Sequence, residues 1–222
     1  MYLAIDTCTE TAGIALFDGE RTVGESIWIA GRNQTSELTP SLGYLLEKHD
    51  VQKTDLKGIA VAKGPGSFNG IRVGMSVAKG LALTLNIDII SATSLEIHAF
   101  PYLNTGNDVC SVIEMGRGEI ATVIFHQDHS IVNSRIEPEL LSPDVLPDRI
   151  STPTNFCGTI SSDMLNLIKS HLGDLALFPR GPLPYRNASD LAYIGYAKIK
   201  AGVTEDASSL APIYVRKPPV GD

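Results

Sequence analysis

One order of hydrophobic periodicities occurs twice along this chain, and it restricts the fold more than any other feature of the sequence. Short runs that alternate or stay apolar predict strands, whereas apolar residues three and four positions apart predict helices. In the first half the predicted order is three strands, a helix, a strand, a helix and a strand, at residues 1–6, 13–17, 22–29, 35–49, 58–62, 71–85 and 87–91.

The second half opens in the same way, after a helical link at 95–102 and a cluster of turn residues at 104–107. Its predicted elements are strands at 109–113, 120–126 and 131–136, a weak strand at 155–157, and helices at 164–171 and 188–201. The halves share the order of elements but not residue identities, which indicates a diverged internal duplication.

Two diverged halves of the βββαβαβ type predict an α/β protein with the bilobed actin-like (ASKHA, ribonuclease-H-like) fold. The lobes are expected at residues 1–103 and 104–222. A single continuous α/β sheet is the structural alternative.

Composition argues against two classes of protein. Apolar residues make up 43% of the 222 residues and charged residues 19%, so burial can offset chain entropy and the chain is not a disordered one. The net charge is −7 and no segment concentrates Lys or Arg. Proteins that bind nucleic acid unaided usually present a basic face, so stand-alone binding of tRNA or DNA is not expected.

The cysteines and the N-terminus indicate a cytoplasmic protein. Cys8, Cys110 and Cys157 are far apart and form no CxxC pair, which is typical of a reducing compartment. Asp6 and Glu10 interrupt the first apolar run, and no apolar run approaches the roughly 18 residues that span a bilayer. We therefore expect no membrane association.

The most informative segment is the glycine-rich stretch 63–74, between a predicted strand and a predicted helix. Gly64 and Gly66 permit backbone conformations that other residues avoid, and Ser67 or Asn69 can cap the helix. Free N–H groups at such a helix start favour an anion. The stretch matches neither the Walker A nor the GxGxxG pattern, so a tight structural turn is the alternative.

The helix after this stretch is apolar on nearly all sides. Gly70, Gly74, Ala78 and Ala82 recur every four residues and form a row that another backbone could approach closely. A helix of this kind is buried on more than one side. We expect its own sheet on one side and, on the other, a second helix from residues 35–49 or from a partner chain. An ordinary core helix is the alternative.

Turns after the first predicted strand of each half carry acidic and hydroxyl residues, at 6–9 and 114–119. In actin-fold phosphotransferases these turns contact phosphate. The candidate nucleotide-binding, anion-binding or complex-supporting residues are Asp6, Thr7, Thr9, Gly64, Gly66, Ser67, Arg117 and Glu119. Only Gly158 follows the strand at 155–157, without the glycine pair that usually clamps an adenosine, which argues against an active kinase or ATPase.

No catalytic or metal-binding motif stands out. The sequence has no HxxxH, HExxH or GxSxG, and the histidines are scattered apart from His126 and His129 in a turn. Cys8 has no neighbouring base. We therefore predict no metal and no catalytic residue.

Six motifs spread along the sequence carry a family resemblance over essentially the whole chain. They are Leu3-Ala4-Ile5-Asp6-Thr7-x-Thr9, the block Gly64-Pro65-Gly66-Ser67-Phe68-x-Gly70-Ile71-Arg72-Val73-Gly74, Ala78-Lys79-Gly80-Leu81-Ala82, Ser94-Leu95-Glu96, Gly116-Arg117-Gly118-Glu119 and Pro212-Ile213-Tyr214-Val215-Arg216. In this order they resemble the bacterial TsaB (YeaZ) family, which older usage groups with glycoproteases.

The resemblance implies a function and a set of partners. It implies an actin-like, non-catalytic subunit that supports TsaD, together with TsaE, in attaching threonylcarbamoyl to adenosine 37 of tRNA. It further implies a homodimer when TsaD is absent, tRNA contact only through the complex, no tightly bound cofactor, and ATP or ADP only at the interface with TsaD. The implied interface residues are Leu38, Leu42, Leu45, Gly70, Arg72, Gly74, Val77, Ala78 and Leu81.

Three positions depart from the family pattern. Asn69 replaces the usual Thr, Gln34 replaces the usual His, and Glu114 replaces the usual Asp. The change at residue 34 leaves the role of the family histidine open in this chain. A stand-alone actin-fold enzyme, either a glycoprotease-like peptidase or a small-molecule kinase, remains the functional alternative.

Overall fold

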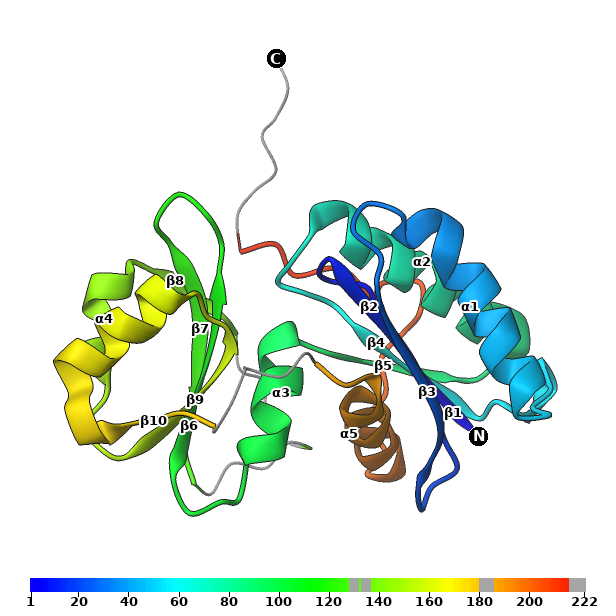
Figure 1. Cartoon of the computed structure of the whole chain (residues 1–222). Helices are drawn as coiled ribbons and strands as arrows, with labels where there is room; N and C mark the ends of the chain where they lie inside the picture. The colour runs from blue at the N-terminus through cyan, green and yellow to red at the C-terminus, as the bar shows by residue number, and fades with distance from the viewer. Residues whose placement is uncertain (128–131, 133–136, 180–185, 216–222) are drawn as a thin grey trace. The chain divides into compact units, whose positions relative to one another are not determined.

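The computed structural model describes residues 1–127, 132, 137–179 and 186–215, and its contacts divide the chain into two units (Figure 1). The first unit comprises Met1–Ile97 and the described residues of the segment 185–214. The second comprises the described residues of 98–184, with Val215.

The first unit is built on a five-stranded mixed sheet. Its strands are β1 (Tyr2–Asp6), β2 (Thr11–Phe17), β3 (Thr22–Ile29), β4 (Gly58–Ala62) and β5 (Asp88–Ala92). The strand order is β3-β2-β1-β4-β5, with β1 to β3 an antiparallel meander and β4 and β5 parallel to β1. The carboxyl ends of β1, β4 and β5 therefore meet at one edge of the sheet.

Helices cover both faces of this sheet (Figure 1). They are α1 (Gln34–Lys48) and α2 (Phe68–Leu85) on one face, and α5 (Ala188–Lys200) on the other, with α3 (Ser94–Ala99) following β5. Leu38, Leu42 and Leu45 bury the inner side of α1 against the unit's core. The predicted elements of the first half are thus confirmed, with ends shifted by a few residues.

Small residues on one face of the sheet let α5 pack closely. A side chain at Gly195 would collide with Ala60 of β4, and one at Gly13 of β2 would press on Ala188. The rings of Tyr2 and Phe17 pack edge-on against Tyr196, the residue after Gly195. These contacts correct the expected boundary at residue 103/104, because α5 was assigned to the second lobe but packs on the first sheet.

The segment after α5 follows the first unit. The N–H of Glu205 donates to Ile89 O of β5, and the N–H of Ile213 donates to Lys63 O. Lys79 Nζ donates to the carbonyls of Ser208 and Leu210. We call residues 203–214 the strap.

The second unit repeats the topology of the first. Its strands are β6 (Asp108–Glu114), β7 (Ile120–Phe125), β8 (Glu139–Leu141), β9 (Thr154–Thr159) and β10 (Ala176–Leu177), and its helix is α4 (Ser162–Leu172). The order β8-β7-β6-β9-β10 corresponds strand for strand to the first sheet. Both units thus have the predicted actin-like, ribonuclease-H-like topology, and the alternative of one continuous sheet is wrong.

Two strands of this unit differ from the prediction. The strand expected at 131–136 lies outside the described residues except for residue 132, and the third strand is β8 at Glu139–Leu141. The two-residue β10 was not predicted, because it is too short to show a period.

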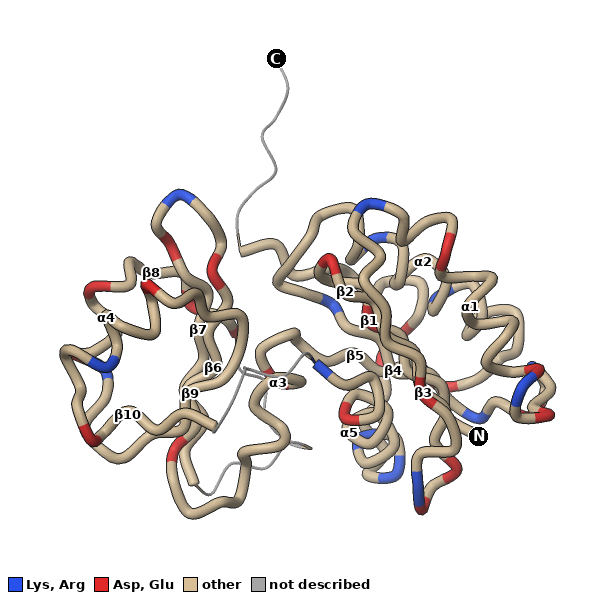
Figure 2. The backbone as a smooth tube through the Cα atoms, viewed as in Figure 1, with Lys and Arg blue, Asp and Glu red and all other residues tan. Residues whose placement is uncertain are grey.

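Charge is interspersed over both units. Figure 2 shows acidic and basic positions mixed along the described chain, in keeping with the net charge of −7. Among the described helices, none combines the length and apolar character needed to cross a bilayer.

Candidate functional site

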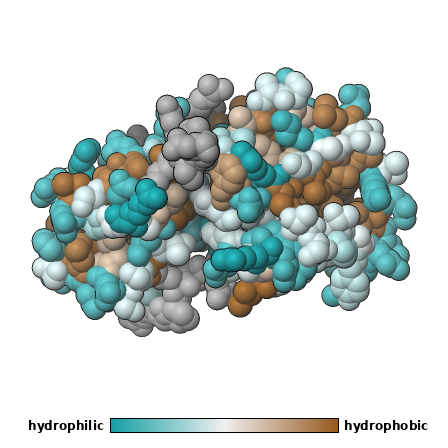
Figure 3. Space-filling view, turned by 90° about the horizontal axis from the view of Figure 1, so that it is seen from above, coloured by the Kyte–Doolittle hydropathy of each residue, from teal (hydrophilic) through white to brown (hydrophobic). Residues whose placement is uncertain are grey.

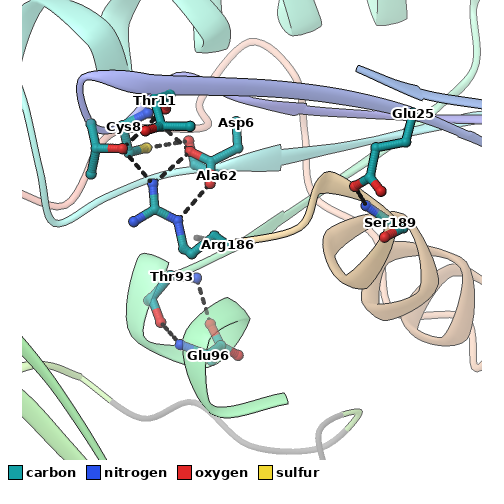
Figure 4. Close-up of polar contacts among 10 residues, drawn as sticks. Asp6, Cys8, Thr11, Glu25, Ala62, Thr93, Glu96, Arg186 and Ser189 are labelled. Atoms are coloured by element: carbon teal, nitrogen blue, oxygen red, sulfur yellow. Dashed lines mark hydrogen bonds and ion pairs between the residues drawn. The ribbon is translucent and has the colours of Figure 1, made fainter. Parts of the chain in front are cut away.

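The carboxyl end of β1 carries a buried ion pair (Figure 4). Arg186, which directly precedes the α5 N-cap Asn187, donates from Nε to Asp6 Oδ2 at 2.6 Å and from Nη2 to Asp6 Oδ1 at 3.1 Å. The two side chains are only 5% and 6% exposed. Asp6 Oδ1 also accepts the N–H of Cys8 at 2.9 Å. Bidentate pairing of this kind fixes both charges in one geometry.

Burial and charge act in opposite directions on Arg186. Burial disfavours its positive charge, but attraction to Asp6 and the hydrogen bonds between them outweigh burial and raise the pKa of the guanidinium. Arg186 therefore stays charged and Asp6 has a permanent counter-ion within the first unit.

The glycine-rich turn packs against the chain after β1. The N–H of Ser67 donates to Cys8 O at 2.6 Å, and Ser67 Oγ accepts the N–H of Gly70 as the N-cap of α2. A side chain at Gly66 would collide with Cys8 O. Gly64, at φ +94°, accepts the N–H of Ser94. The close approach of two backbones explains the glycines here.

The hydroxyl groups that were expected to face an anion form hydrogen bonds within the first unit instead. Thr7, 1% exposed, donates from Oγ1 to Gly70 O at 2.6 Å. Thr9 Oγ1 donates to Thr11 O and accepts from Arg186 Nη2 at 3.4 Å. Gln34 is buried and donates from Nε2 to Thr9 O and Gly31 O. Gln34 thus joins the start of α1 to the turn after β1.

The three cysteines are free and buried. Burial raises the pKa of Cys8 and of Cys157 far above the usual thiol range, and raises that of Cys110 to about 12. The thiols therefore stay protonated at neutral pH, and they are poor nucleophiles. Within the described residues, no three His, Cys, Asp or Glu side chains are arranged to hold a metal ion.

The corresponding turn of the second unit joins β6 to β7. Arg117 is exposed and, between Gly116 and Gly118, adopts φ +57°. The N–H of Glu119 donates to Gly116 O, which closes the turn. Glu114 accepts the N–H of Ser161, the N-cap of α4, and so supports the start of that helix.

The small-residue row of α2 faces the first unit's own sheet, so its expected role at a partner interface is wrong. Ala78 is 0% exposed, and a side chain at Gly74 would collide with Thr7 Oγ1. A side chain at Gly70 would collide with Thr7 O. The residues of this row are small because α2 lies close to β1 and to the turn after β1. Leu38, Leu42 and Leu45, also expected at the interface, lie in the core instead.

The other side of α2 is open, and with the outer side of α1 it forms what we call the α1–α2 face. Its residues are Thr39 and Gly43 of α1 and Val73, Val77, Gly80 and Leu81 of α2. Val73, Val77 and Leu81 are half-buried, and nothing lies within 4 Å of a side chain built at Gly43 or Gly80. Figure 3 shows apolar residues gathered on the surface of the first unit.

Arg72 lies at the edge of this face and bonds within the unit. It lies 3.7 Å over the Phe68 ring and donates from Nε to Tyr214 Oη of the strap. Sequence reasoning found Arg72 but missed Tyr214 and Arg186. Their partners are 142 and 180 residues away, and no local pattern signals such a pair.

Comparisons with known proteins identify the family. The family model described as TsaD, tRNA N6-adenosine threonylcarbamoyltransferase, matches residues 28–148, more than half of the chain. The Bacillus subtilis tRNA threonylcarbamoyladenosine biosynthesis protein TsaB is 29% identical over 96% of this chain and 93% of its own length. The Escherichia coli protein of that name is 30% identical over 67% of this chain and 65% of its own length.

Solved structures agree with the sequence comparison. A Pseudomonas aeruginosa protein with similarity to peptidase YEAZ superposes with a TM-score of 0.80 at 23% identity, over 97% of this chain and 99% of that one. The ROK hexokinase from Thermus thermophilus shares the fold alone, with a TM-score of 0.54 at 10% identity, over 90% of this chain and 99% of that one. The motifs, the two-sheet topology and these relatives together show that the chain belongs to the TsaB (YeaZ) family.

Proposed function

We propose that this chain is the non-catalytic subunit of the complex that makes tRNA threonylcarbamoyladenosine, and that it docks on the catalytic subunit TsaD through its α1–α2 face. The names of its Bacillus and Escherichia relatives support a place in this pathway. The observation that carries the docking proposal is the unpartnered α1–α2 face itself.

The chemistry of this face suits a helical partner. Val73, Val77 and Leu81 follow one another every four residues, so they form an apolar stripe on α2. Gly43 and Gly80 have open space beside them, which allows another helix to approach closely. The half-buried Val77 and Leu81 therefore offer apolar surface that a partner can cover.

The extent of the TsaD match favours TsaD as the occupant. Residues 28–148, which this family model matches, include both α1 and α2, so TsaD proteins are expected to carry related helices. Two related surfaces can pack about a pseudo-twofold axis. The same reasoning supports self-association of this chain when TsaD is absent.

Several features support a non-catalytic role. The buried cysteines are protonated, and Asp6 is already paired with Arg186. The dispersed charge argues against tRNA binding by this chain alone, so we propose that tRNA is bound only by the assembled complex with TsaD and TsaE. ATP or ADP at the interface with TsaD is part of the same proposal. Free, buried cysteines fit action in the cytoplasm.

The test is a charged substitution on the open side of α2. Val77→Asp places an unpaired carboxylate in the proposed interface, and we expect binding to TsaD from the same host to fall at least tenfold. Val145→Asp, an identical change at an exposed valine of the second unit, is the matched control and should bind normally. Titration calorimetry measures binding, and circular dichroism checks folding.

Binding of folded Val77→Asp to TsaD at the wild-type level would exclude this face as the docking surface.

A second experiment tests the function. Threonylcarbamoylation of tRNA is assayed with TsaD, TsaE and the companion enzymes, with and without this chain. Product formed equally well without it would contradict the proposed function. Hydrolysis of ATP or peptides by the pure chain would instead favour the stand-alone enzyme.

A further inference from the structure

The position beside Asp6 is the best candidate for a ligand site in the first unit, apart from the α1–α2 face. Asp6 ends β1, the central strand of the sheet, where β4 runs parallel to it. In open α/β sheets, ligands bind outside the carboxyl ends of such strands. A buried carboxylate at this place would ordinarily attract a cationic ligand.

The chain supplies that cation itself. The guanidinium of Arg186 contacts both oxygens of Asp6 (Figure 4). Its Nη2 also lies 3.4 Å from Thr9 Oγ1. Because Asp6 Oδ1 further accepts the N–H of Cys8, any external cation would have to displace Arg186. Displacement of Arg186 from Asp6 would leave the guanidinium, which is 5% exposed, buried without its counter-ion.

We propose that the position beside Asp6 is a cation site that the chain fills with its own Arg186, so that the intact protein admits there neither a divalent cation nor the metal-phosphate group of a nucleotide. Arg186 acts as a built-in ligand. It also joins the chain just before α5 to the end of β1 within the first unit. This inference is independent of docking through the α1–α2 face.

Chemical rescue tests the site. Arg186→Ala removes the guanidinium, leaves Asp6 uncompensated and should lower the melting temperature. We expect methylguanidinium at about 10 mM to recover most of that loss, because a ligand that binds only the folded state stabilises it. Guanidinium compounds otherwise lower stability, so recovery has the opposite sign to a solvent effect. Mn²⁺ is added in a parallel sample to test the divalent class.

Two controls isolate the site. Asp6→Asn combined with Arg186→Ala lacks the carboxylate and should respond to neither cation. The wild-type melting temperature should not rise with methylguanidinium, Mn²⁺ or Mg²⁺ with ADP. If Arg186→Ala is unfolded in buffer, recovery of its far-ultraviolet circular dichroism on adding methylguanidinium is the measurement.

Recovery of Arg186→Ala by either cation, with no response in the double variant, would support the proposal. Two results would overturn it. One is the absence of recovery with both cations. The other is stabilisation of the wild type by Mn²⁺ or by Mg²⁺ with ADP that disappears in Asp6→Asn, which would mean that the position is open. Neither result bears on TsaD binding, which Val77→Asp tests separately.

Discussion

Lys198 Nζ of α5 lies 3.1 Å from Glu96 Oε1 of α3, and the two side chains are 7% and 6% exposed. Glu96 Oε2 accepts the N–H of Thr93, whose hydroxyl in turn accepts the N–H of Glu96 (Figure 4). Lys198 Nζ also lies within reach of Ser91 O. One carboxylate therefore holds α5 and caps the start of α3.

Lys198→Met should destabilise the protein by about 3–5 kcal/mol, because it leaves Glu96 charged and buried without its cation. Combining it with Glu96→Gln removes the second charge and should recover most of the loss. Urea denaturation measures both, with exposed Lys200→Met as the control. Equal losses in the single and double variants would show that the pair's charges do not matter.

Ala78→Trp should unfold the first unit or lower its melting temperature sharply. Ala78 is fully buried against the unit's own sheet, and overpacking there costs on the order of 1–3 kcal/mol or more. Ala60→Trp in β4 is the core reference. Thermal melting followed by circular dichroism compares them. If Ala78→Trp stays stably folded and loses only its association with a partner, the small-residue row lies at a partner interface and the assignment to the core is wrong.

Alanine at two glycines of α2 should change stability in opposite directions. Gly80→Ala adds a methyl group in open space and should stabilise the protein by about 0.5–1 kcal/mol, the helix advantage of Ala over Gly. Gly74→Ala should destabilise it, because the new methyl collides with Thr7 Oγ1. The urea midpoints of the two variants measure these changes in stability. An increase in stability for both variants would be inconsistent with the packing of α2 on β1.

Asp190 should make stability depend on pH. Burial is the main cause that raises the pKa of its carboxyl to about 6, and the negative charge of Glu25 adds to this rise. The hydrogen bond from Asn187 acts in the opposite direction and lowers the pKa. Since the folded pKa exceeds the unfolded value of 3.8, the wild type loses stability as the pH rises through this range. Asp190→Asn should gain about 1–2 kcal/mol above pH 6, a figure reduced for partial exposure.

The gain from Asp190→Asn should shrink as the pH falls from about 6 toward 3.8 and disappear about one pH unit below 3.8, where the carboxyl is protonated in both states. Urea midpoints of wild type and variant from about pH 3 to pH 8 measure the difference. A gain that does not vary with pH would assign it to packing rather than to ionisation.

Lys79→Met should loosen the strap. Its ammonium donates to Ser208 O at 3.1 Å and to Leu210 O at 2.9 Å. Losing these bonds should speed hydrogen exchange of the nearby Ile213 N–H, which donates to Lys63 O, by about tenfold. Lys48→Met on α1 is the control. Unchanged exchange at Ile213 in Lys79→Met would show that Tyr214 and Arg72 suffice to hold the strap.

Local pattern was sufficient to predict most elements and the repeated topology. The spacing of Leu38, Leu42 and Leu45 marks α1, and Ser67 with the following apolar residues marks α2. Strand β10 was missed because two residues carry no period. The boundary was misplaced because α5 follows the second sheet in sequence yet packs on the first.

The sequence by itself determined the elements of the first half, most of those of the second, the family, and an α2 helix with two non-polar sides. Only the tertiary structure decided which of those sides is buried within the chain. Gly74 and Ala78 can lie close to Thr7 and β1, whereas the bulkier Val77 and Leu81 remain partly open, and helical periodicity is the same for both. The pairing of Asp6 with Arg186 also depends on the fold, since a contact across 180 residues exists only once both segments have packed.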